Sequence, residues 1–397
     1  MSDDPRHAAH LRWVGAAQLL GVVRAEPGIT RAAAAQRLGI SSGGATDLVA
    51  RLRQARLLDE APAPAQGRGR PTTLLVPHPE GPLVLAADLR ATDWRLALAG
   101  LDGAPRIVAG GAYKDPGLDV ALATLTDAIA AVHRRKAKQL SALAVSVAGT
   151  VSDAKLVQFT PRGRRDVDLS LLTSTLPRRA DVPMLLGNDA TLAGLAEART
   201  GAARAAGTSL HLIVATGIGG TLVVNGEPMS GAHGAAGEYG HIPFGDPALA
   251  CPCGARGCWD LTVDGRALAR YRGDPPPDDP VDYVHRLLGR PGDDVATRQA
   301  FEAVAASLGR GIGGLVNLHD PDVITLGGVG ALLRGAAAET FEAAYREGLM
   351  AYRQDAPPPV RDAEHGEEGS LRGAVIMAMD HVTAPAGLAD WAQRQSM

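Results

Sequence analysis

The sequence predicts an α/β protein of two similarly built lobes, preceded by a small all-α domain that carries a two-stranded wing. The first observation is that apolar residues recur at helical intervals through residues 11–58. The second is an order of strand, strand, strand, helix and strand that begins near residue 83 and recurs after residue 182. The third is size, because 397 residues, 46% of them hydrophobic, suffice for two or three domains with substantial cores.

Charge and apolar patterning restrict the surroundings in which the protein can act. A formal net charge of -3 gives no sign of nucleic-acid binding by the whole chain, so such a function must reside in one segment. The N-terminal MSDDPRHAAH lacks a basic-then-apolar pattern, and no apolar run is long enough to span a bilayer. We therefore expect a cytoplasmic protein without a membrane partner.

The N-terminal segment has the layout of a helix-turn-helix. Thr30 is a candidate N-cap for the second helix, Gly39 supplies a tight turn, and Ser41 or Ser42 begins the third helix. The first residues of such a recognition helix reach base edges in the major groove of DNA. The residues that we expect at the DNA from this helix are Ser41, Ser42, Thr46 and Arg51.

A wing is predicted directly after the third helix. Residues 57–60 and 72–76 can pair as a hairpin around PAPAQGRGRP, in which Arg68 and Arg70 stand among glycines. Such arginines can lie along a narrow minor groove because the missing side chains let the backbone approach. The alternative is a helical docking domain with a solvated arginine face. The wing favours a double-stranded DNA operator, bound by a homodimer or homotetramer.

Apolar runs beyond residue 82 predict the two lobes. The first contains the strands LVLAADLR, DWRLALAG, APRIVAGGAY and ALAVSVAG, with a helix at about residues 118–136. The second contains VPMLLGND, LHLIVATGIGGTLVVNG and VITLGG. Two such lobes facing a cleft are the layout of the actin-like (ribonuclease H-like) fold. The expected domains are residues 1–77, 78–185 and 186–397, with a C-terminal helix that packs back on the first lobe.

All three cysteines lie in the stretch EYGHIPFGDPALACPCGARGCWD, residues 238–260. Three thiols and one imidazole make the tetrahedral ligand set of a structural Zn²⁺ ion, and the spacing lets one loop wrap a single ion. The alternative, a disulfide with a spare thiol, is disfavoured by the odd cysteine count and the lack of a secretory segment. The predicted metal ligands are His241, Cys251, Cys253 and Cys258.

GEYGHIPF and CPCGARGCWD resemble the zinc-bearing signature of the ROK family, which includes sugar kinases and transcriptional repressors. The resemblance covers nearly all of residues 83–382 and implies the two-lobed sugar-kinase fold. It implies that His241 binds zinc through one ring nitrogen and a sugar through the other, and that Glu238 also holds the sugar. Family members usually carry a glutamate where this chain has Asp260, and we expect the shorter carboxylate to contact the ligand as well.

Asn188 and Asp189 precede a helical pattern, and on the dipeptide alone an ordinary N-cap is the better interpretation. The resemblance adds a second role, because in the family's kinases this asparagine orients the sugar and this aspartate takes the proton from the attacking hydroxyl. The ligand-binding residues that it implies are Asn188, Asp189, Glu238, His241 and Asp260.

The first phosphate loop departs from the family pattern. Sugar kinases of this fold carry Asp-x-Gly-Gly-Thr, whereas Asp88–Thr92 reads DLRAT, with Arg90 and Ala91 in place of the glycines that let backbone N–H groups reach phosphate. The second loop, TGIGG at residues 216–220, stays glycine-rich. We therefore predict a repressor of sugar-metabolism genes with a degenerate kinase cleft that binds a sugar or sugar phosphate. The alternative is an active ATP-dependent sugar kinase that also binds DNA and uses Asp189.

Overall fold

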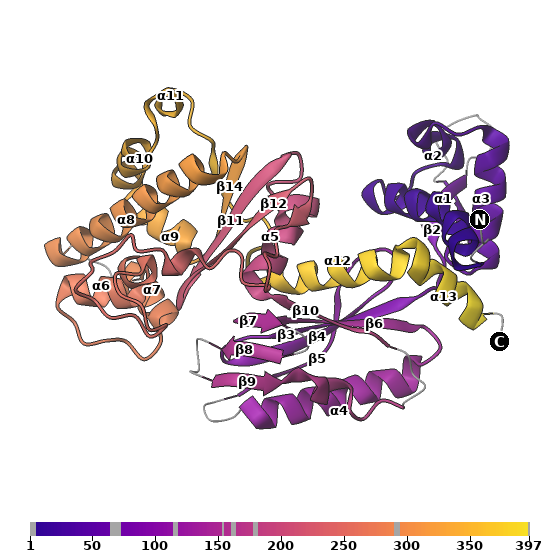
Figure 1. The fold of residues 1–397 in the computed structure, drawn as a ribbon, viewed down its shortest axis with the longest axis horizontal. Coiled ribbons are helices and arrows are strands. Elements are labelled where there is room, and N and C mark those ends of the chain that lie inside the picture. Colours follow the sequence, from indigo (N-terminus) through magenta and orange to yellow (C-terminus); the bar gives the residue numbers. More distant parts are fainter. Residues whose placement is uncertain are drawn as a thin grey trace. The chain divides into compact units, whose positions relative to one another are not determined.

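The chain folds into two compact units (Figure 1). The computed structural model describes residues 5–63, 73–113, 118–152, 155–159, 164–177, 182–289 and 294–395. Unit 1 comprises Met1–Ser146, Asp168–Leu186 and Ala374–Met397, and unit 2 comprises Val147–Val167 and Gly187–Gly373. Each unit is thus assembled from segments that are distant in the sequence. No helix in the described ranges is long and apolar enough to cross a membrane.

Unit 1 begins with three helices and a hairpin. The elements are α1 (Pro5–Ala25), α2 (Arg31–Leu38), α3 (Ser42–Gln54), β1 (Leu58–Pro62) and β2 (Thr73–Pro77). The hydroxyl of Thr30 accepts a hydrogen bond from the backbone N–H of Ala33, as an N-cap does, and Gly39 ends α2 with φ of 65°. The hydroxyl of Ser41 accepts from the N–H of Gly44, so Ser41 caps α3.

The hairpin confirms the predicted wing. β1 and β2 pair antiparallel from Leu58 opposite Pro77 to Pro62 opposite Thr73. The N–H of Leu75 also donates to the carbonyl of Ile29, which ties the wing to the start of α2. The predicted tip of the wing, with Arg68 and Arg70, lies outside the described residues.

The remainder of unit 1 is built on a five-stranded sheet with strand order β10-β6-β3-β4-β5. Its elements are β3 (Leu83–Leu89), β4 (Asp93–Ala99), β5 (Arg106–Ala112), α4 (Leu118–Lys136), β6 (Leu140–Val147), η2 (Leu169–Thr173) and β10 (Met184–Asn188). Every residue of β6 is buried, as expected for its apolar run. Two C-terminal helices complete the unit, α12 (Gly369–Thr383) and α13 (Pro385–Gln395).

Unit 2 contains a second five-stranded sheet, with strand order β13-β12-β11-β14-β15. Its strands are β11 (Thr208–Ala215), β12 (Gly217–Val224), β13 (Glu227–Pro228), β14 (Val323–Gly328) and β15 (Val360–Asp362). A separate three-stranded sheet is formed by β7 (Thr150–Ser152), β8 (Lys155–Phe159) and β9 (Arg164–Asp168). β12 pairs antiparallel with β11, whereas β14 pairs parallel with it.

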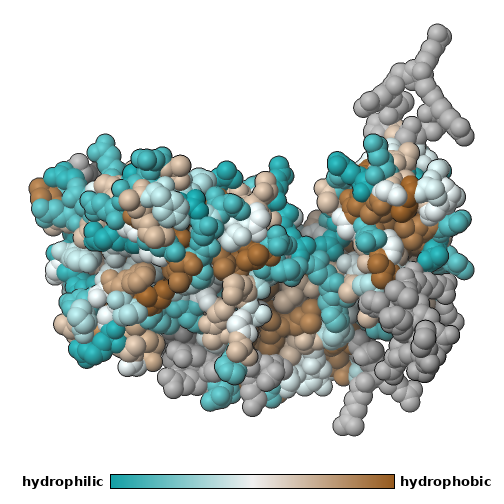
Figure 2. Space-filling model, turned by 45° about the horizontal axis from the view of Figure 1, so that its top comes forward, coloured by the Kyte–Doolittle hydropathy of each residue, from teal (hydrophilic) through white to brown (hydrophobic). Residues whose placement is uncertain are grey.

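Helices and short helical turns complete unit 2. They are α5 (Asp189–Thr200), η3 (Tyr239–His241), η4 (Trp259–Thr262), α6 (Gly265–Arg272), α7 (Pro280–Leu288), α8 (Val295–His319), α9 (Gly330–Ala336), α10 (Ala338–Glu347), α11 (Ala351–Gln354) and η5 (Gly366–Glu368). The core encloses large side chains such as Trp259, Phe341 and Tyr345. On the face shown in Figure 2, hydrophobic side chains form patches among hydrophilic ones.

The two five-stranded sheets have the same plan. Each begins with consecutive antiparallel strands, β3-β4-β5 in unit 1 and β11-β12-β13 in unit 2. In each sheet the first of these strands lies beside a strand that comes later in the chain, β6 or β14. The repeated order of three strands, helix and strand is therefore confirmed, as is the small helical domain before it. The assignment of VPMLLGND to the second lobe was wrong, because this segment forms β10 and pairs with β6 in the first sheet.

Candidate metal centre and ligand site

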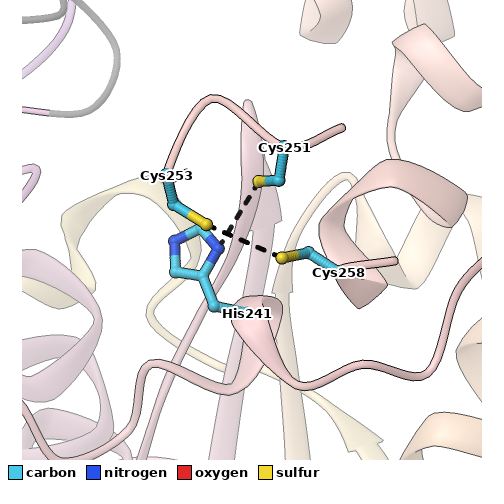
Figure 3. Close-up of side chains that lie close together, drawn as sticks. All are labelled: His241, Cys251, Cys253 and Cys258. Atoms are coloured by element: carbon cyan, nitrogen blue, oxygen red, sulfur yellow. Dashed lines mark hydrogen bonds between the residues drawn. The ribbon is translucent and has the colours of Figure 1, made fainter. Parts of the chain in front are cut away.

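The side chain of His241, at the end of η3, and the three cysteine side chains that follow it converge on one point (Figure 3). The ligand atoms of His241, Cys251, Cys253 and Cys258 all lie within 4.8 Å of one another. Nδ1 of His241 is 3.8 Å from Sγ of Cys251, and Sγ of Cys253 is 3.7 Å from Sγ of Cys258. The structure thus brings together the predicted metal ligands, a set that could hold a metal ion such as zinc.

The loop is folded in a way that suits an ion. Gly254 and Gly257 have φ of 101° and 68°, values that favour glycine, so the chain can turn sharply directly after Cys253 and directly before Cys258. All three thiols are free rather than joined in a disulfide. Burial and the neighbouring thiols of Cys251 and Cys253 raise the pKa of the Cys258 thiol to about 12. Ionised sulfurs in this position need a nearby cation, and a divalent metal could supply that charge.

The loop that carries the candidate metal ligands, residues 241–258, is called the metal loop. A row of polar contacts extends from its first residue, His241, to Asn188. Nε2 of His241 lies 4.0 Å from a carboxylate oxygen of Glu238. The other oxygen of Glu238 accepts a hydrogen bond of 2.7 Å from Oγ1 of Thr150. The preceding residue, Gly149, offers its carbonyl to Nδ2 of Asn188 at 3.1 Å. Asn188 is therefore linked within unit 2 to Glu238 and His241, two predicted ligand residues that are about 50 positions away in the chain.

Gly149 and Thr150 did not emerge from the sequence as candidate site residues. Both follow the buried strand β6, and Thr150 begins β7. A polar residue shortly after a fully buried strand was the one available signal, since binding side chains often lie where such strands end.

Asn188 and Asp189 lie at the N-terminus of α5. Oδ1 of Asn188 accepts a hydrogen bond from the N–H of Thr191 at 3.0 Å, which is an N-cap contact. Its Nδ2 makes the contact to Gly149, so the same side chain caps the helix and joins the polar row. Oδ1 of Asp189 accepts a hydrogen bond from the N–H of Ala190 at 2.9 Å.

Asp260 lies on the metal side of His241. Its Oδ2 is 3.8 Å from Nδ1 of His241, the nitrogen that faces Cys251, whereas Glu238 is near Nε2. Oδ1 of Asp260 accepts a hydrogen bond of 2.6 Å from the N–H of Ile218. The buried carboxylate thereby ties the metal loop to the turn between β11 and β12. Its contact with a ligand, expected from the resemblance, remains a prediction.

The turn between β3 and β4 contains Arg90 and Ala91, which stand where sugar kinases of this fold have the two glycines of the first phosphate loop. The N–H of Arg90 donates to the carbonyl of Asp93 at 2.9 Å, and the hydroxyl of Tyr113 donates to the carbonyl of Arg90. The N–H of Tyr113 also donates to the carbonyl of Thr92 at 2.8 Å. The guanidinium of Arg90 is 3.6 Å from the Asp93 carboxylate. The N–H of Arg90 and the carbonyls of Arg90 and Thr92 are thus already hydrogen-bonded within unit 1.

The residues of the recognition helix that are predicted to contact DNA lie on α3 or directly before it. Ser41, Ser42 and Thr46 are exposed, and Oγ1 of Thr46 donates to the carbonyl of Ser42. Arg51 is half-buried in the last turn of the helix. Arg53 is paired with acids of β1, at 3.1 Å from Asp59 and 3.4 Å from Glu60. The first turn of α3 therefore presents small hydroxyl groups to solvent.

Comparisons with known proteins agree with this architecture. The model of the ROK family matches residues 86–381, and that of the MarR family matches residues 14–69. A glucokinase of Streptomyces coelicolor is 26% identical over 276 residues, covering 64% of this chain and 86% of the relative. The xylose repressor of Bacillus subtilis is 27% identical over 188 residues, covering 47% of this chain and 48% of the relative.

A solved structure gives the same fold from end to end. The crystal structure of a ROK family transcriptional regulator, described as a homolog of the E. coli MLC protein, matches with a TM-score of 0.75. The match covers 96% of this chain and 99% of that chain at 21% sequence identity. Both the helical N-terminal domain and the two-sheet module are thus present in one known protein.

Proposed function

This chain belongs to the ROK family, and from that premise we propose that it is a transcriptional repressor of sugar-metabolism genes. A sugar or sugar phosphate, bound at the row Asn188, Asp189, Glu238 and His241, lowers its affinity for a double-stranded DNA operator. The observation that carries the proposal is the linkage of Asn188, Glu238 and His241 through Gly149 and Thr150, within unit 2 of a chain that also has a MarR-type winged domain. It acts in the cytoplasm as a homodimer or homotetramer, because two half-sites are read by paired recognition helices.

We further propose that the metal is a structural Zn²⁺ ion held by His241 and the three cysteines. When bound, zinc takes thiolate and imidazole ligands in a tetrahedral set and fixes their orientation. With Nδ1 of His241 on the metal side, Nε2 is left to hydrogen-bond a hydroxyl group beside Glu238. The metal loop thereby orients a sugar-binding imidazole rather than performing chemistry.

We also propose that the protein does not phosphorylate its ligand. In support of this, the amide of Arg90 already donates to Asp93, and the side chains of Arg90 and Ala91 stand where a phosphate cradle needs glycine. The second candidate is an ATP-dependent sugar kinase that also binds DNA. Retention of Asp189 at the start of α5 and the likeness to a glucokinase favour it.

One set of titrations tests the ligand site. D-glucose, D-xylose and N-acetyl-D-glucosamine are titrated calorimetrically, and the affinity for duplexes selected from random sequence is measured by fluorescence anisotropy with and without each sugar. Asp189→Asn should weaken sugar binding about 10- to 100-fold, since a charge-assisted hydrogen bond is worth roughly 1.5–3 kcal/mol. DNA affinity without sugar should not change. Asp278→Asn, an exposed acid before α7, is the matched control and should behave as wild type.

Two outcomes would contradict the proposal. If no panel sugar binds and none changes the duplex affinity, the sensing role fails. If a coupled ADP-release assay shows sugar-dependent ATP turnover of about 1 per second or faster, the kinase candidate replaces the repressor.

The DNA interface is tested separately. Arg68→Ala with Arg70→Ala should weaken binding to every duplex and flatten its salt dependence, because fewer phosphate counterions are released. Thr46→Ala or Ser42→Ala should instead alter which sequences are selected, as expected for groups at base edges. Thr124→Ala, an exposed threonine on α4, is the control. An unchanged salt slope in the double arginine variant would remove the wing from the interface.

A further inference from the structure

The helix that begins with the proposed ligand residues is held to the segment before α12. The Glu197 carboxylate, on α5, is buried and accepts hydrogen bonds from the N–H groups of Ala202, Glu364 and His365 at 2.9, 3.1 and 2.8 Å. Oγ1 of Thr200 lies 2.8 Å from Nε2 of His365. The C-terminal half of α5 and residues 364–365 are therefore one rigid assembly in unit 2.

The first turns of α12 pack against the first turns of α5 at backbone distance. A side chain at Gly373 would overlap the carbonyl of Leu192, and one at Gly369 would lie 3.2 Å from Cβ of Ala193. Leu192 and Ala193 follow Asn188 and Asp189 by one helical turn. Figure 1 shows α12 beginning beside α5. A displacement of α5 by a bound ligand must therefore displace the start of α12.

The opposite end of α12 is bonded to the first helix of the DNA-binding domain. In unit 1, a guanidinium nitrogen of Arg24 is 2.9 Å from the carboxylate of Asp380. The other terminal nitrogen of Arg24 donates to Oγ1 of Thr383 at 3.1 Å. Both groups are only partly exposed, so the contact is less screened than an ordinary surface ion pair.

The helix that follows, α13, reaches the recognition helix itself. Nε1 of Trp391 donates a hydrogen bond of 2.7 Å to the carbonyl of Ala55, and both atoms are buried. Ala55 is the C-cap of α3. Trp391 and Leu388 are fully buried, and Arg394 anchors the end of α13 to Ser141 at 2.9 Å. The C-terminal end of α3 is thus hydrogen-bonded to α13.

We propose that α12 and α13 transmit ligand occupancy at α5 to the recognition helix α3, with Gly373, Asp380 and Trp391 as the positioning residues. The inference rests on the proposed function and names the part of the chain through which that function is regulated. α12 is one continuous helix whose first residues belong to unit 2 and whose last residues belong to unit 1. A helix transmits a push or a rotation along its length because its backbone hydrogen bonds resist bending.

The first experiment measures coupling in the full-length protein. Trp391→Phe removes one buried N–H while keeping a ring, and Asp380→Asn removes the charge that faces Arg24. Each variant is titrated with a selected duplex in the presence and absence of D-glucose, D-xylose and N-acetyl-D-glucosamine. Sugar affinity should stay within about twofold of wild type, while the sugar-induced loss of DNA affinity, about 5- to 150-fold in typical allosteric proteins, should shrink at least threefold.

Two substitutions serve as matched controls. Trp94→Phe changes a buried tryptophan of β4, and Asp390→Asn changes an exposed acid of α13 for which no ion pair is found among the described residues. Both should keep the wild-type ratio of DNA affinities with and without sugar. If Trp391→Phe and Asp380→Asn also keep the full ratio, the C-terminal helices do not transmit the signal and the inference is overturned.

The second experiment needs no sugar. Because coupling is reciprocal, duplex binding to α3 must alter the stability of α5. Amide hydrogen exchange of Asp189–Thr200 should therefore change when wild type binds the duplex, and this change should be lost in Trp391→Phe. Exchange in α5 that ignores the duplex would overturn the inference even if sugar releases the protein from DNA. Failure of the proposed function is distinct, because wild type itself would then ignore the sugars or bind no duplex.

Discussion

The two sheets carry the same first hairpin, but the turns of these hairpins are held in different ways. In unit 1 the β3–β4 turn is closed by its near neighbours, since Arg90 contacts Asp93 and Tyr113. In unit 2 the β11–β12 turn contains Gly217, with φ of 127°, and receives the carboxylate of Asp260. A side chain at Gly217 would place its Cβ 2.8 Å from Oδ2 of Asp260.

The comparison shows which contacts stabilise the β3–β4 turn and which stabilise the β11–β12 turn. The β3–β4 turn depends on its own hairpin and on Tyr113, which directly follows β5. It should therefore form whenever the sheet of unit 1 folds. The β11–β12 turn depends on Asp260, which closely follows the loop that carries the proposed metal ligands. Perturbing the metal loop should consequently affect the unit 2 turn and leave the unit 1 turn unchanged.

Removing the metal should have the largest effect on this contrast. Cys253→Ser, or treatment with a strong chelator, should lower the free energy of unfolding of unit 2 by about 5 kcal/mol or more, because metal binding to such a loop is coupled to its folding. Trp259 lies in unit 2, whereas Trp13, Trp94 and Trp391 lie in unit 1. Urea unfolding of single-tryptophan variants would separate the units, with elemental analysis for zinc content.

Ala255→Ser is the control for this experiment, because Ala255 is an exposed position in the same loop that offers no ligand. It should retain about one zinc per chain, the stoichiometry of a single four-ligand site. Full stability of unit 2 in metal-free Cys253→Ser would separate the ion from the folding of the loop.

Acid should destabilise unit 2 through a buried histidine in β11. Burial lowers the pKa of His211 from 6.5 to about 4, although Glu197 opposes the shift, and Nδ1 lies 2.9 Å from Oγ1 of Thr325. Below pH 6.5 the unfolded chain binds the proton first, so stability falls between about pH 6.5 and 4, by roughly 3 kcal/mol in all. β3, the corresponding strand of unit 1, contains no histidine.

The measurement is urea unfolding at a series of pH values. His211→Gln should remove most of the slope in this window, whereas His233→Gln, an exposed histidine, should keep it. A wild-type slope in His211→Gln would place the acid sensitivity on another group.

Filling the unit 2 turn should have an intermediate effect. Gly217→Ala adds a Cβ against Asp260 at a φ that disfavours alanine, which should cost about 1–3 kcal/mol in the free energy of unfolding. Gly335→Ala, on α9 where nothing lies within 4 Å of the added atom, is the control and should be neutral or stabilising. Equal stability of the two variants would mean that the turn tolerates a displaced Asp260.

The smallest effect is expected from restoring glycine in the unit 1 turn. Arg90→Gly with Ala91→Gly should lower stability by only about 1 kcal/mol, through added freedom of the unfolded chain. We expect no sugar-dependent ATP turnover, because the closing contacts of Tyr113 use backbone groups and survive. ADP release above background in the variant, with none in wild type, would show that the two lost glycines alone separate this cleft from a kinase.

The sequence predicted those parts of the fold that depend on local pattern. Caps such as Thr30 and Ser41, the hairpin after α3, and the cluster of His241 with three cysteines all follow from residue type and short spacing. Periodicity likewise predicted the repeated order of strands.

Long-range contacts were beyond such reasoning. Nothing in the sequence joins Thr150 to Glu238, which is 88 positions away, or Trp391 to Ala55, which is 336 positions away. The resemblance suggested a ligand contact for Asp260 but not its bond to the amide of Ile218. Such pairings depend on tertiary packing, which composition and period do not encode.

The contact between Trp391 and Ala55 also has a consequence for how the protein folds during its synthesis on the ribosome. The chain is synthesised from its N-terminus, so α1–α3 leave the ribosome long before α13. The surface of α13 that they contact lies at Pro385–Gln395, far beyond the end of α3 at Gln54. Helices α1–α3 therefore cannot dock on α13 until the whole of the intervening two-sheet module has been synthesised.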